Sequence, residues 1–247
     1  MVLYQRSRCM KERFYRKELR KENLVGFEVK EKETDLFILA EKSLKEEAKI
    51  AILKYRAELE GYIRKDPGFK EALEPWEIKE EAPLLVQAMA EASFKAGVGP
   101  MAAVAGTLSE FIGYDLLSHS QEVIIENGGD IFIKTNKPRR MGIFAGDSSF
   151  NGLALEIDPS LTPLGVCTSS GTVGHSLSLG QADAVVVVSC STPLADATAT
   201  AIGNLIQQES SIHEGIALAK KIEGVKGVVI IIGSQMGAWG TIELVNA

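Results

Sequence analysis

The sequence has few of the features that tie a small secreted protein together or anchor one in a membrane. Among its 247 residues are three cysteines, Cys9, Cys167 and Cys190, without Cys-x-x-Cys spacing, so no disulfide framework is indicated. No apolar run is long enough to span a bilayer, and no apolar segment adjoins the basic N-terminus. These absences predict a protein of the reducing cytoplasm that has no membrane partner.

Net positive charge is also absent. The formal net charge is -6, and hydrophobic residues make up 45% of the chain. We therefore expect no nucleic-acid partner and a single globular body of enzyme size with a substantial core. The first 24 residues are nevertheless basic, which indicates a solvated arm that could close on a partner subunit or on an anionic ligand. A homo-oligomer is one arrangement that such an arm would allow.

Two common phosphate-binding signatures are missing. Residues 97–106 begin a helix with glycine, alanine and other small residues, yet they lack the lysine and hydroxyl of a P-loop and the glycine spacing of a dinucleotide fold. Close packing of this helix on a neighbour explains the small residues as well as a ligand does.

The apolar pattern predicts a mixed α/β fold in one domain, residues 1–247. An N-terminal hairpin and helix subregion, residues 1–95, is expected to pack on a core of residues 96–247 that carries the site. Small-residue helices at Pro100 and Pro193 are each followed by strands, which favours two related sheet-and-helix halves. The predicted strands are 24–29, 36–40, 121–126, 130–134, 141–145, 153–157, 164–168, 184–189, 227–232 and 239–244, and the predicted helices are 42–64, 83–96, 100–117, 193–207 and 210–222.

The segment Asn127-Gly128-Gly129-Asp130 lies between two apolar runs. An Asn-Gly hairpin turn is the simpler interpretation. The same four residues could also grip a ligand through their amides, the Asn127 side chain and the Asp130 carboxylate. Sequence alone leaves both interpretations open.

A segment rich in hydroxyl groups follows the apolar run 164–166. Its members Thr168, Ser169, Ser170, Gly171 and Thr172 offer many donors with little bulk, as expected of a site for an anion or a sugar alcohol. Cys167 and His175 flank them and are the candidate catalytic residues. A buried strand cysteine is the commoner role of a residue such as Cys167, whereas His175 could equally move a proton.

Asp196 and Thr200 stand four residues apart in the helix predicted after Pro193. This spacing stacks the two side chains on one face, where they can offer two hard oxygen ligands to a cation such as Mg²⁺. The alternative is that Asp196 only complements the positive first turn of a well-capped helix.

Taken in order, several of these segments resemble landmarks of the ApbE family, whose members bind flavin and transfer the FMN moiety of FAD to protein threonine. They are Asn127-Gly128-Gly129-Asp130, Ser170-Gly171, His175 and Ala195-Asp196-Ala197-Thr198-Ala199-Thr200. The longer segments 98–106, 126–130, 165–176 and 194–204 are similar in sequence to those of an uncharacterised ApbE-like branch. Members of that branch also begin with a hairpin that contains Glu33-Thr34-Asp35-Leu36 here. The resemblance implies an ApbE-like fold, Mg²⁺ at Asp196 and Thr200, and FAD or FMN as the cofactor.

The sequence departs from the ApbE pattern in two places. After His175 it continues Ser176-Leu177-Ser178-Leu179-Gly180, where ApbE proteins carry His-x-x-Asp-Pro-x-Thr-Gly. No charged side chain occurs between Gly97 and Thr107, where those proteins place a lysine or glutamate before glycine. The resemblance therefore implies the metal and phosphate part of the site more directly than flavin transfer itself.

Three hypotheses of function follow. The leading one is an ApbE-like enzyme, of the FMN transferase type, that binds a phosphorylated small molecule with Mg²⁺. The second is sulfur chemistry, in which Cys167 carries a persulfide or serves sulfide assimilation. The third is a binding module without catalytic activity.

Overall fold

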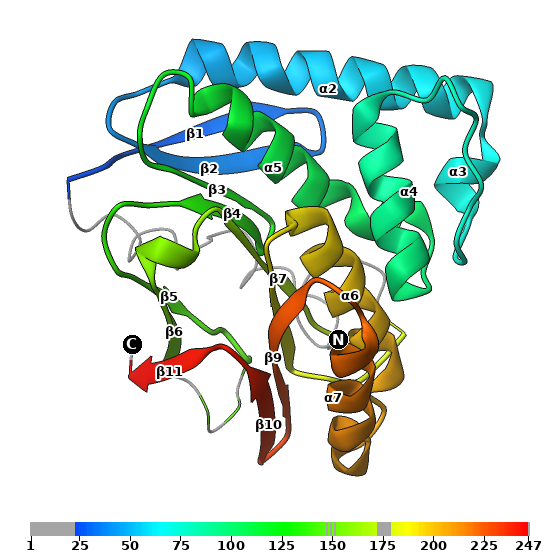
Figure 1. Cartoon of the computed structure of the whole chain (residues 1–247), viewed down its shortest axis with the longest axis vertical. Coiled ribbons are helices and arrows are strands. Elements are labelled where there is room, and N and C mark those ends of the chain that lie inside the picture. Colours follow the sequence, from blue (N-terminus) through cyan, green and yellow to red (C-terminus); the bar gives the residue numbers. More distant parts are fainter. Residues whose placement is uncertain (1–22, 147, 149, 151, 172–178, 247) are drawn as a thin grey trace, which may run out of the picture.

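The computed structural model describes residues 23–146, 148, 150, 152–171 and 179–246 (Figure 1). Its centre is an eight-stranded sheet in the order β1-β2-β3-β4-β7-β8-β9-β10, in which every neighbouring pair is antiparallel. The strands are β1 (Val25–Glu31), β2 (Thr34–Ala40), β3 (Val123–Asn127), β4 (Asp130–Lys134), β7 (Leu164–Ser169), β8 (Ala184–Ser189), β9 (Val225–Ile232) and β10 (Gln235–Gly240).

The large sheet consists of two similar halves that meet where β4 pairs with β7. Each half is a hairpin, a group of helices and a second hairpin, so the expected two sheet-and-helix halves are confirmed. The first group contains α2 (Lys45–Lys65), α3 (Gly68–Glu71), α4 (Leu84–Ala96), η2 (Pro100–Ala103) and α5 (Val104–Leu116). The second contains α6 (Thr192–Leu205), η4 (Glu209–Ser211) and α7 (Ile212–Lys221).

The alternation of side chains along the strands divides the core into two layers. On one face Ile38, Ile125 and Val187 join the helices in one apolar cluster. On the other face Leu39, Ile124 and many similar residues pack with a small sheet, so both faces of the central strands are buried. The small sheet has the order β11-β6-β5, with β5 (Arg139–Gly142), β6 (Leu153–Ile157) and β11 (Glu243–Asn246), and η3 (Pro159–Leu161) follows β6.

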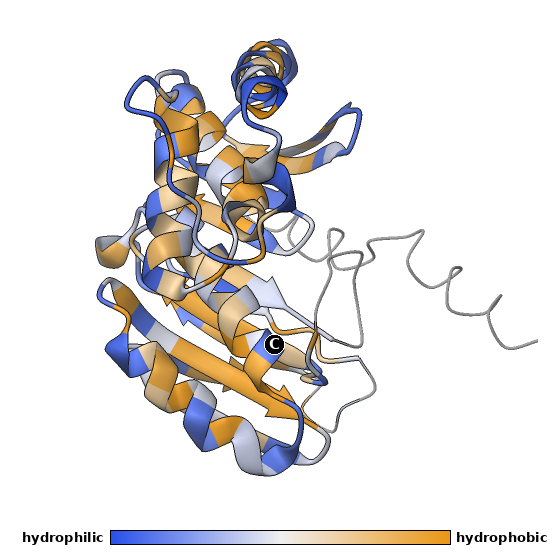
Figure 2. Ribbon diagram, turned by 90° about the vertical axis from the view of Figure 1, so that its right-hand side faces the viewer, coloured by the Kyte–Doolittle hydropathy of each residue, from blue (hydrophilic) through white to orange (hydrophobic). Residues whose placement is uncertain are grey.

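The N-terminal hairpin and helix pack directly on the rest of the molecule. β2 pairs with β3 along five residue pairs, from Leu36 opposite Asn127 to Ala40 opposite Val123. Helix α2 buries Ile52, Tyr55, Leu59 and other residues at helical spacing, and in Figure 1 it crosses above the sheet beside α5. Figure 2 shows the same strands as a mainly hydrophobic layer, with polar residues on the outer faces of the helices.

One predicted strand was wrong. The run 239–244 is divided between β10, which lies at the edge of the large sheet, and β11, which belongs to the small sheet. The chain turns between them at Gly240, whose φ is +105° and whose hydrogen atom faces the Lys226 carbonyl oxygen so closely that no Cβ would fit. The helix predicted over 100–117 is present, with the short η2 at its start and α5 as the rest. None of the helices in the described part of the chain is long and apolar enough to cross a membrane.

Candidate functional site

The segment Asn127–Asp130 is the turn that joins β3 to β4. Gly128 and Gly129 have φ values of +71° and +118°, which glycine adopts readily and which a two-residue hairpin needs. The hairpin interpretation is therefore confirmed. The turn is also tied to a helix, because the Asn127 side-chain amide donates to the Ala105 carbonyl oxygen in the first turn of α5 at 3.2 Å.

The Asp130 side chain is half-buried beside β7. Its carboxylate accepts the Thr168 amide hydrogen and is in hydrogen-bonding contact with the Cys167 thiol. Burial, together with the negative charge of Glu126, raises the pKa of Asp130 to about 7. This acid can therefore hold or release a proton near neutral pH.

Asp196 lies on α6 and is 8% exposed. Its Oδ2 accepts the Gly106 amide hydrogen at 2.8 Å, and its carboxylate also accepts the Ala105 amide hydrogen. These amides belong to the first turn of α5, where helix amides have no partner within the helix. Burial and the nearby Asp130 charge raise the pKa of Asp196 well above its ordinary value, because two close carboxylates cannot both ionise without repulsion.

Thr200 is half-buried one turn after Asp196 on the same helix. Thr200 and Asp196 carry hard oxygen donors of the kind that Mg²⁺ prefers, one turn apart on one helix. The described residues contain no group of three or more histidine, cysteine, aspartate and glutamate side chains that could hold a metal ion. A cation here would thus have two carboxylates and take its other ligands from hydroxyl groups, water or phosphate, as Mg²⁺ commonly does.

The hydroxyl-rich segment begins beside Asp130, which accepts the Thr168 amide hydrogen. Thr168 and Ser169 close β7 and are half-buried, as is Ser170. The Gly171 amide donates to the Ala182 carbonyl oxygen at 2.9 Å, so that amide is already occupied within the protein. Thr172 and His175 lie outside the described residues, and their assignments stay predictions.

Cys167 is a core residue of β7 with no exposed surface. Its Sγ lies 3.5 Å from the Thr192 carbonyl oxygen, and burial together with the Asp130 charge raises the pKa of the thiol well above its ordinary value. A catalytic cysteine needs the opposite, a lowered pKa and access to a substrate. The geometry thus favours the core interpretation of Cys167 over the catalytic one and lends no support to the sulfur hypothesis.

Two glutamates near the site were not predicted from the sequence. Glu126 is 1% exposed and accepts the Gly129 amide hydrogen at 3.1 Å, which steadies the turn. Glu110 on α5 accepts the Thr192 amide hydrogen at 2.6 Å. That contact joins residues 82 positions apart, so no local sequence pattern could have indicated it.

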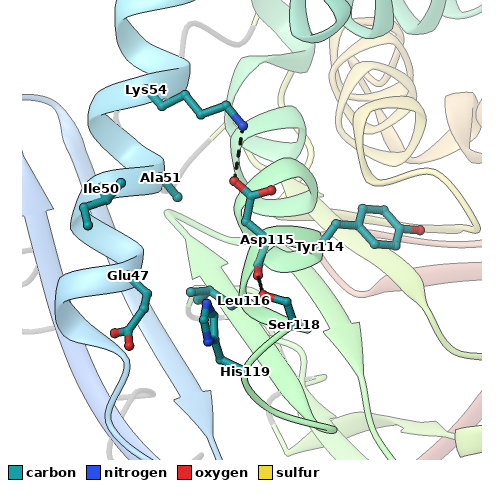
Figure 3. Close-up of a pocket in the computed structure, with 9 residues that line it drawn as sticks. All are labelled: Glu47, Ile50, Ala51, Lys54, Tyr114, Asp115, Leu116, Ser118 and His119. Atoms are coloured by element: carbon teal, nitrogen blue, oxygen red, sulfur yellow. Dashed lines mark hydrogen bonds and ion pairs between the residues drawn. The ribbon is translucent and has the colours of Figure 1, made fainter.

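Two surface cavities lie elsewhere. One of about 400 Å³ opens between α2 and the end of α5, lined by Glu47, Lys54, Tyr114, His119 and their neighbours (Figure 3). In it the Lys54 ammonium group pairs with the Asp115 carboxylate at 3.5 Å. The other, of about 180 Å³, is lined by residues of β6, β9 and nearby loops. Neither is lined by a residue predicted for the site.

Comparisons with known proteins agree on one family. A sequence model of the family described as "AbpE bacteria" matches residues 16–225. A UPF0280 protein of Methanocella arvoryzae is 43% identical over 210 residues, which is 85% of this chain and 86% of that protein. A UPF0280 protein of Methanococcoides burtonii is 42% identical over 221 residues, covering 87% and 92% of the two chains.

Solved ApbE structures share the fold. The flavinyl transferase ApbE of Pseudomonas stutzeri superposes with a TM-score of 0.57 at 16% identity, covering 88% of this chain and 94% of that one. The ApbE protein of Thermotoga maritima gives a TM-score of 0.58 at 14% identity, with coverage of 87% and 96%. At such low identity the likeness establishes the fold. With the matches to the family model and to the UPF0280 proteins, it shows that the chain belongs to the ApbE-like family described as "AbpE bacteria", in its uncharacterised UPF0280 branch.

Proposed function

We propose that the protein binds a flavin nucleotide, FAD or FMN, together with Mg²⁺, and that it acts as an enzyme that transfers the FMN moiety of FAD. The observation that carries the proposal is the pair of carboxylates Asp130 and Asp196, which lie close enough that the charge of Asp130 raises the pKa of Asp196. Two buried like charges are costly unless a proton or a cation neutralises them. The ApbE-like fold and the name of the flavinyl transferase neighbour support the choice of ligand.

Asp196, Asp130 and Thr200 would hold the cation through oxygen atoms. Bound Mg²⁺ would neutralise charge on the two phosphates of FAD as the phosphoanhydride bond between them breaks. Asp196 has a second task, because its Oδ2 already accepts the Gly106 amide hydrogen and so fixes α6 relative to α5. The Asn127 side chain holds the glycine turn against the same helix.

Hydroxyl groups of Thr168, Ser169 and Ser170 would orient the phosphate or ribityl part of the ligand. His175 is proposed as the group that takes the proton from the acceptor hydroxyl. A small phosphorylated ligand is thus the proposed partner. The acceptor would be a threonine hydroxyl, as the resemblance to ApbE proteins implies. Its oxygen would bond to the FMN phosphorus while AMP leaves.

The test is a calorimetric titration of Mg²⁺ in the presence of FAD with three proteins: the unchanged chain, Asp196→Asn and Thr200→Val. Asparagine keeps an oxygen that can accept from Gly106 but removes the charge, and valine keeps the volume of threonine but removes its hydroxyl. We expect each to lower Mg²⁺ affinity by about tenfold or more. The control is Glu214→Gln on α7, whose side chain is 57% exposed and should have no effect.

Equal Mg²⁺ affinity in all four proteins would overturn the proposal. Binding of FAD with Mg²⁺ but without transfer of FMN to a threonine peptide would instead identify a binding module. Incubation of the unchanged protein with FAD, Mg²⁺ and such a peptide, followed by mass spectrometry of the peptide, separates these outcomes.

A further inference from the structure

Helices α5 and α6 each place a carboxylate against a backbone amide in the first turn of the other helix. Asp196 on α6 accepts the Gly106 amide hydrogen near the start of α5. In return, Glu110 on α5 accepts the amide hydrogen of Thr192, the first residue of α6, at 2.6 Å. Each helix thus supplies the anion that its partner's positive end favours. Nothing in the proposed function explains the contact of Glu110 with Thr192.

From these reciprocal contacts we infer that Glu110 is a positioning residue for the cation site. It fixes the first turn of α6, and the position of that turn sets the position of the Asp196 carboxylate. The inference rests on the proposed function only in taking Asp196 as a cation ligand. Thr192 and Asp196 are four residues apart, so they lie on one face of α6 about 6 Å apart along its axis. A shift of the first turn therefore moves Asp196 directly.

The first turn of α6 lies between two backbones that leave it no room. A Cβ built at Gly165 on β7 would meet Thr192 Cα at 2.4 Å, and one built at Gly106 on α5 would meet the Thr192 carbonyl oxygen at 2.6 Å. Gly165 and Gly106 thus confine Thr192 between β7 and α5. These contacts limit sideways movement of the turn, whereas Glu110 holds it by a directed hydrogen bond.

Glu110 is not needed as an ordinary cap. Ser191 already occupies the N-cap position of α6, and its side chain accepts the Leu194 amide hydrogen. Glu110 adds a second, longer-range acceptor although it is partly buried, and burial raises the pKa of its carboxyl group. A local cap would serve helix formation alone, whereas an acceptor on α5 also sets the position of α6 relative to α5.

The experiment compares Glu110→Ala, which removes the acceptor, with Glu110→Gln, which keeps an acceptor oxygen at the same reach. Glu91→Gln, an exposed substitution on α4 where Glu91 pairs with Lys95, is the matched control. The first readout needs no metal: amide hydrogen exchange at Thr192 and Gly106, and the pH titration of the Asp196 carboxyl carbon by NMR. The second readout is Mg²⁺ affinity by calorimetry.

We expect Glu110→Ala to speed exchange at both amides and to shift the Asp196 titration, while Glu110→Gln and Glu91→Gln stay close to the unchanged protein. Mg²⁺ affinity should fall roughly 10- to 100-fold in Glu110→Ala, as is typical when a residue that orients a metal ligand is lost, and should be largely restored in Glu110→Gln. If Glu110→Ala does not fold, Glu110→Asp, whose shorter side chain cannot keep the 2.6 Å contact without movement, replaces it with the same expectations.

An unchanged Asp196 titration and unchanged Gly106 exchange in the folded alanine or aspartate variant would refute the positioning role. So would a glutamine variant as impaired as alanine, since the role assigned is that of an acceptor. Failure of the unchanged protein to bind Mg²⁺ would overturn the proposed function alone, because the exchange and titration readouts would still decide on Glu110.

Discussion

At the scale of single residues, Asp130 and Asp196 are anchored by different parts of the fold, and the pKa of each is raised. Asp196 accepts amide hydrogens from the start of α5, so its position is fixed by a helix. Asp130 contacts the Thr168 amide and the Cys167 thiol, both on β7. Asp130, with its pKa of about 7, exchanges its proton near neutral pH.

Mg²⁺ affinity should therefore depend on pH through Asp130. A proton on this carboxyl competes with the cation, so apparent affinity should rise as the pH passes through about 7. Calorimetry at pH 5.5 to 8.5 measures this, and Asp130→Asn should lower the affinity and flatten the profile. A wild-type profile with no inflection between about pH 6 and 8 would rule out Asp130 as the titrating ligand.

Without metal, the same carboxyl should lower the free energy of unfolding as pH rises. Its folded-state pKa of about 7 lies above the ordinary 3.8, so the folded state binds more protons than the unfolded state in that window. The stabilisation from this proton is complete below pH 3.8 and is lost as pH rises to about 7. Urea unfolding at pH 5 and 7.5 should show the loss in the unchanged protein and a smaller one in Asp130→Asn; equal losses in the two would assign the effect to other groups.

The two cysteines in the described part of the chain should differ in reactivity. Cys190 is exposed and Cys167 is buried with a raised pKa, so iodoacetamide should label Cys190 in the native protein and Cys167 only after denaturation. Peptide mass spectrometry measures both sites in one sample. Rapid native labelling of Cys167 would restore the sulfur hypothesis.

At the scale of elements, the contact of α5 with α6 depends on one position without a side chain. A Cβ at Gly106 would meet the Thr192 carbonyl oxygen at 2.6 Å and Asp196 Cβ at 2.8 Å, and neither can yield without moving α6. Gly106→Ala should therefore destabilise the fold by about 1–3 kcal/mol and weaken Mg²⁺ binding as well.

The matched control for Gly106→Ala is Gly61→Ala in α2. There the nearest contact of a new Cβ is the flexible end of Arg64 at 3.6 Å, so alanine should stabilise the helix by up to about 1 kcal/mol. Urea denaturation of both variants gives the comparison. A Gly106→Ala protein as stable as the Gly61→Ala protein would show that the two helices separate without cost.

The sequence indicated these elements well where periodicity was strong and poorly where a boundary depended on distant contacts. The spacing of Ile52, Tyr55 and Leu59 predicted α2, and the Asn127–Asp130 turn was among the expected interpretations. The split of 239–244 into two strands could not be predicted, because it depends on Gly240 passing the Lys226 backbone. Likewise, the contact of Glu110 with Thr192 is visible only once α5 lies against α6.

At the scale of the whole molecule, one continuous sheet connects the N-terminal hairpin to the last hairpin of the large sheet. β2 pairs with β3 in the first half, and β4 pairs with β7 across the boundary between the halves. Helices of both halves share one apolar cluster on the same face. Separate unfolding of either half would expose apolar surface and unpaired strand edges of the other half.

The chain should consequently unfold as one cooperative unit, residues 1–95 included, and its only two tryptophans provide a probe in each part. Trp76 precedes α4, where its indole donates to Asp66 at 3.1 Å, and Trp239 lies on β10 in the second half. In Trp239→Phe the fluorescence reports on the N-terminal subregion, and in Trp76→Phe it reports on the far edge of the sheet. Within each variant, the urea midpoint from fluorescence should coincide with the urea midpoint from far-ultraviolet circular dichroism. Because both midpoints come from the same variant, any loss of stability caused by the substitution affects them equally. A Trp76 transition at clearly lower urea than the circular dichroism transition of the same variant would show that residues 1–95 unfold separately, and the chain would then have two domains.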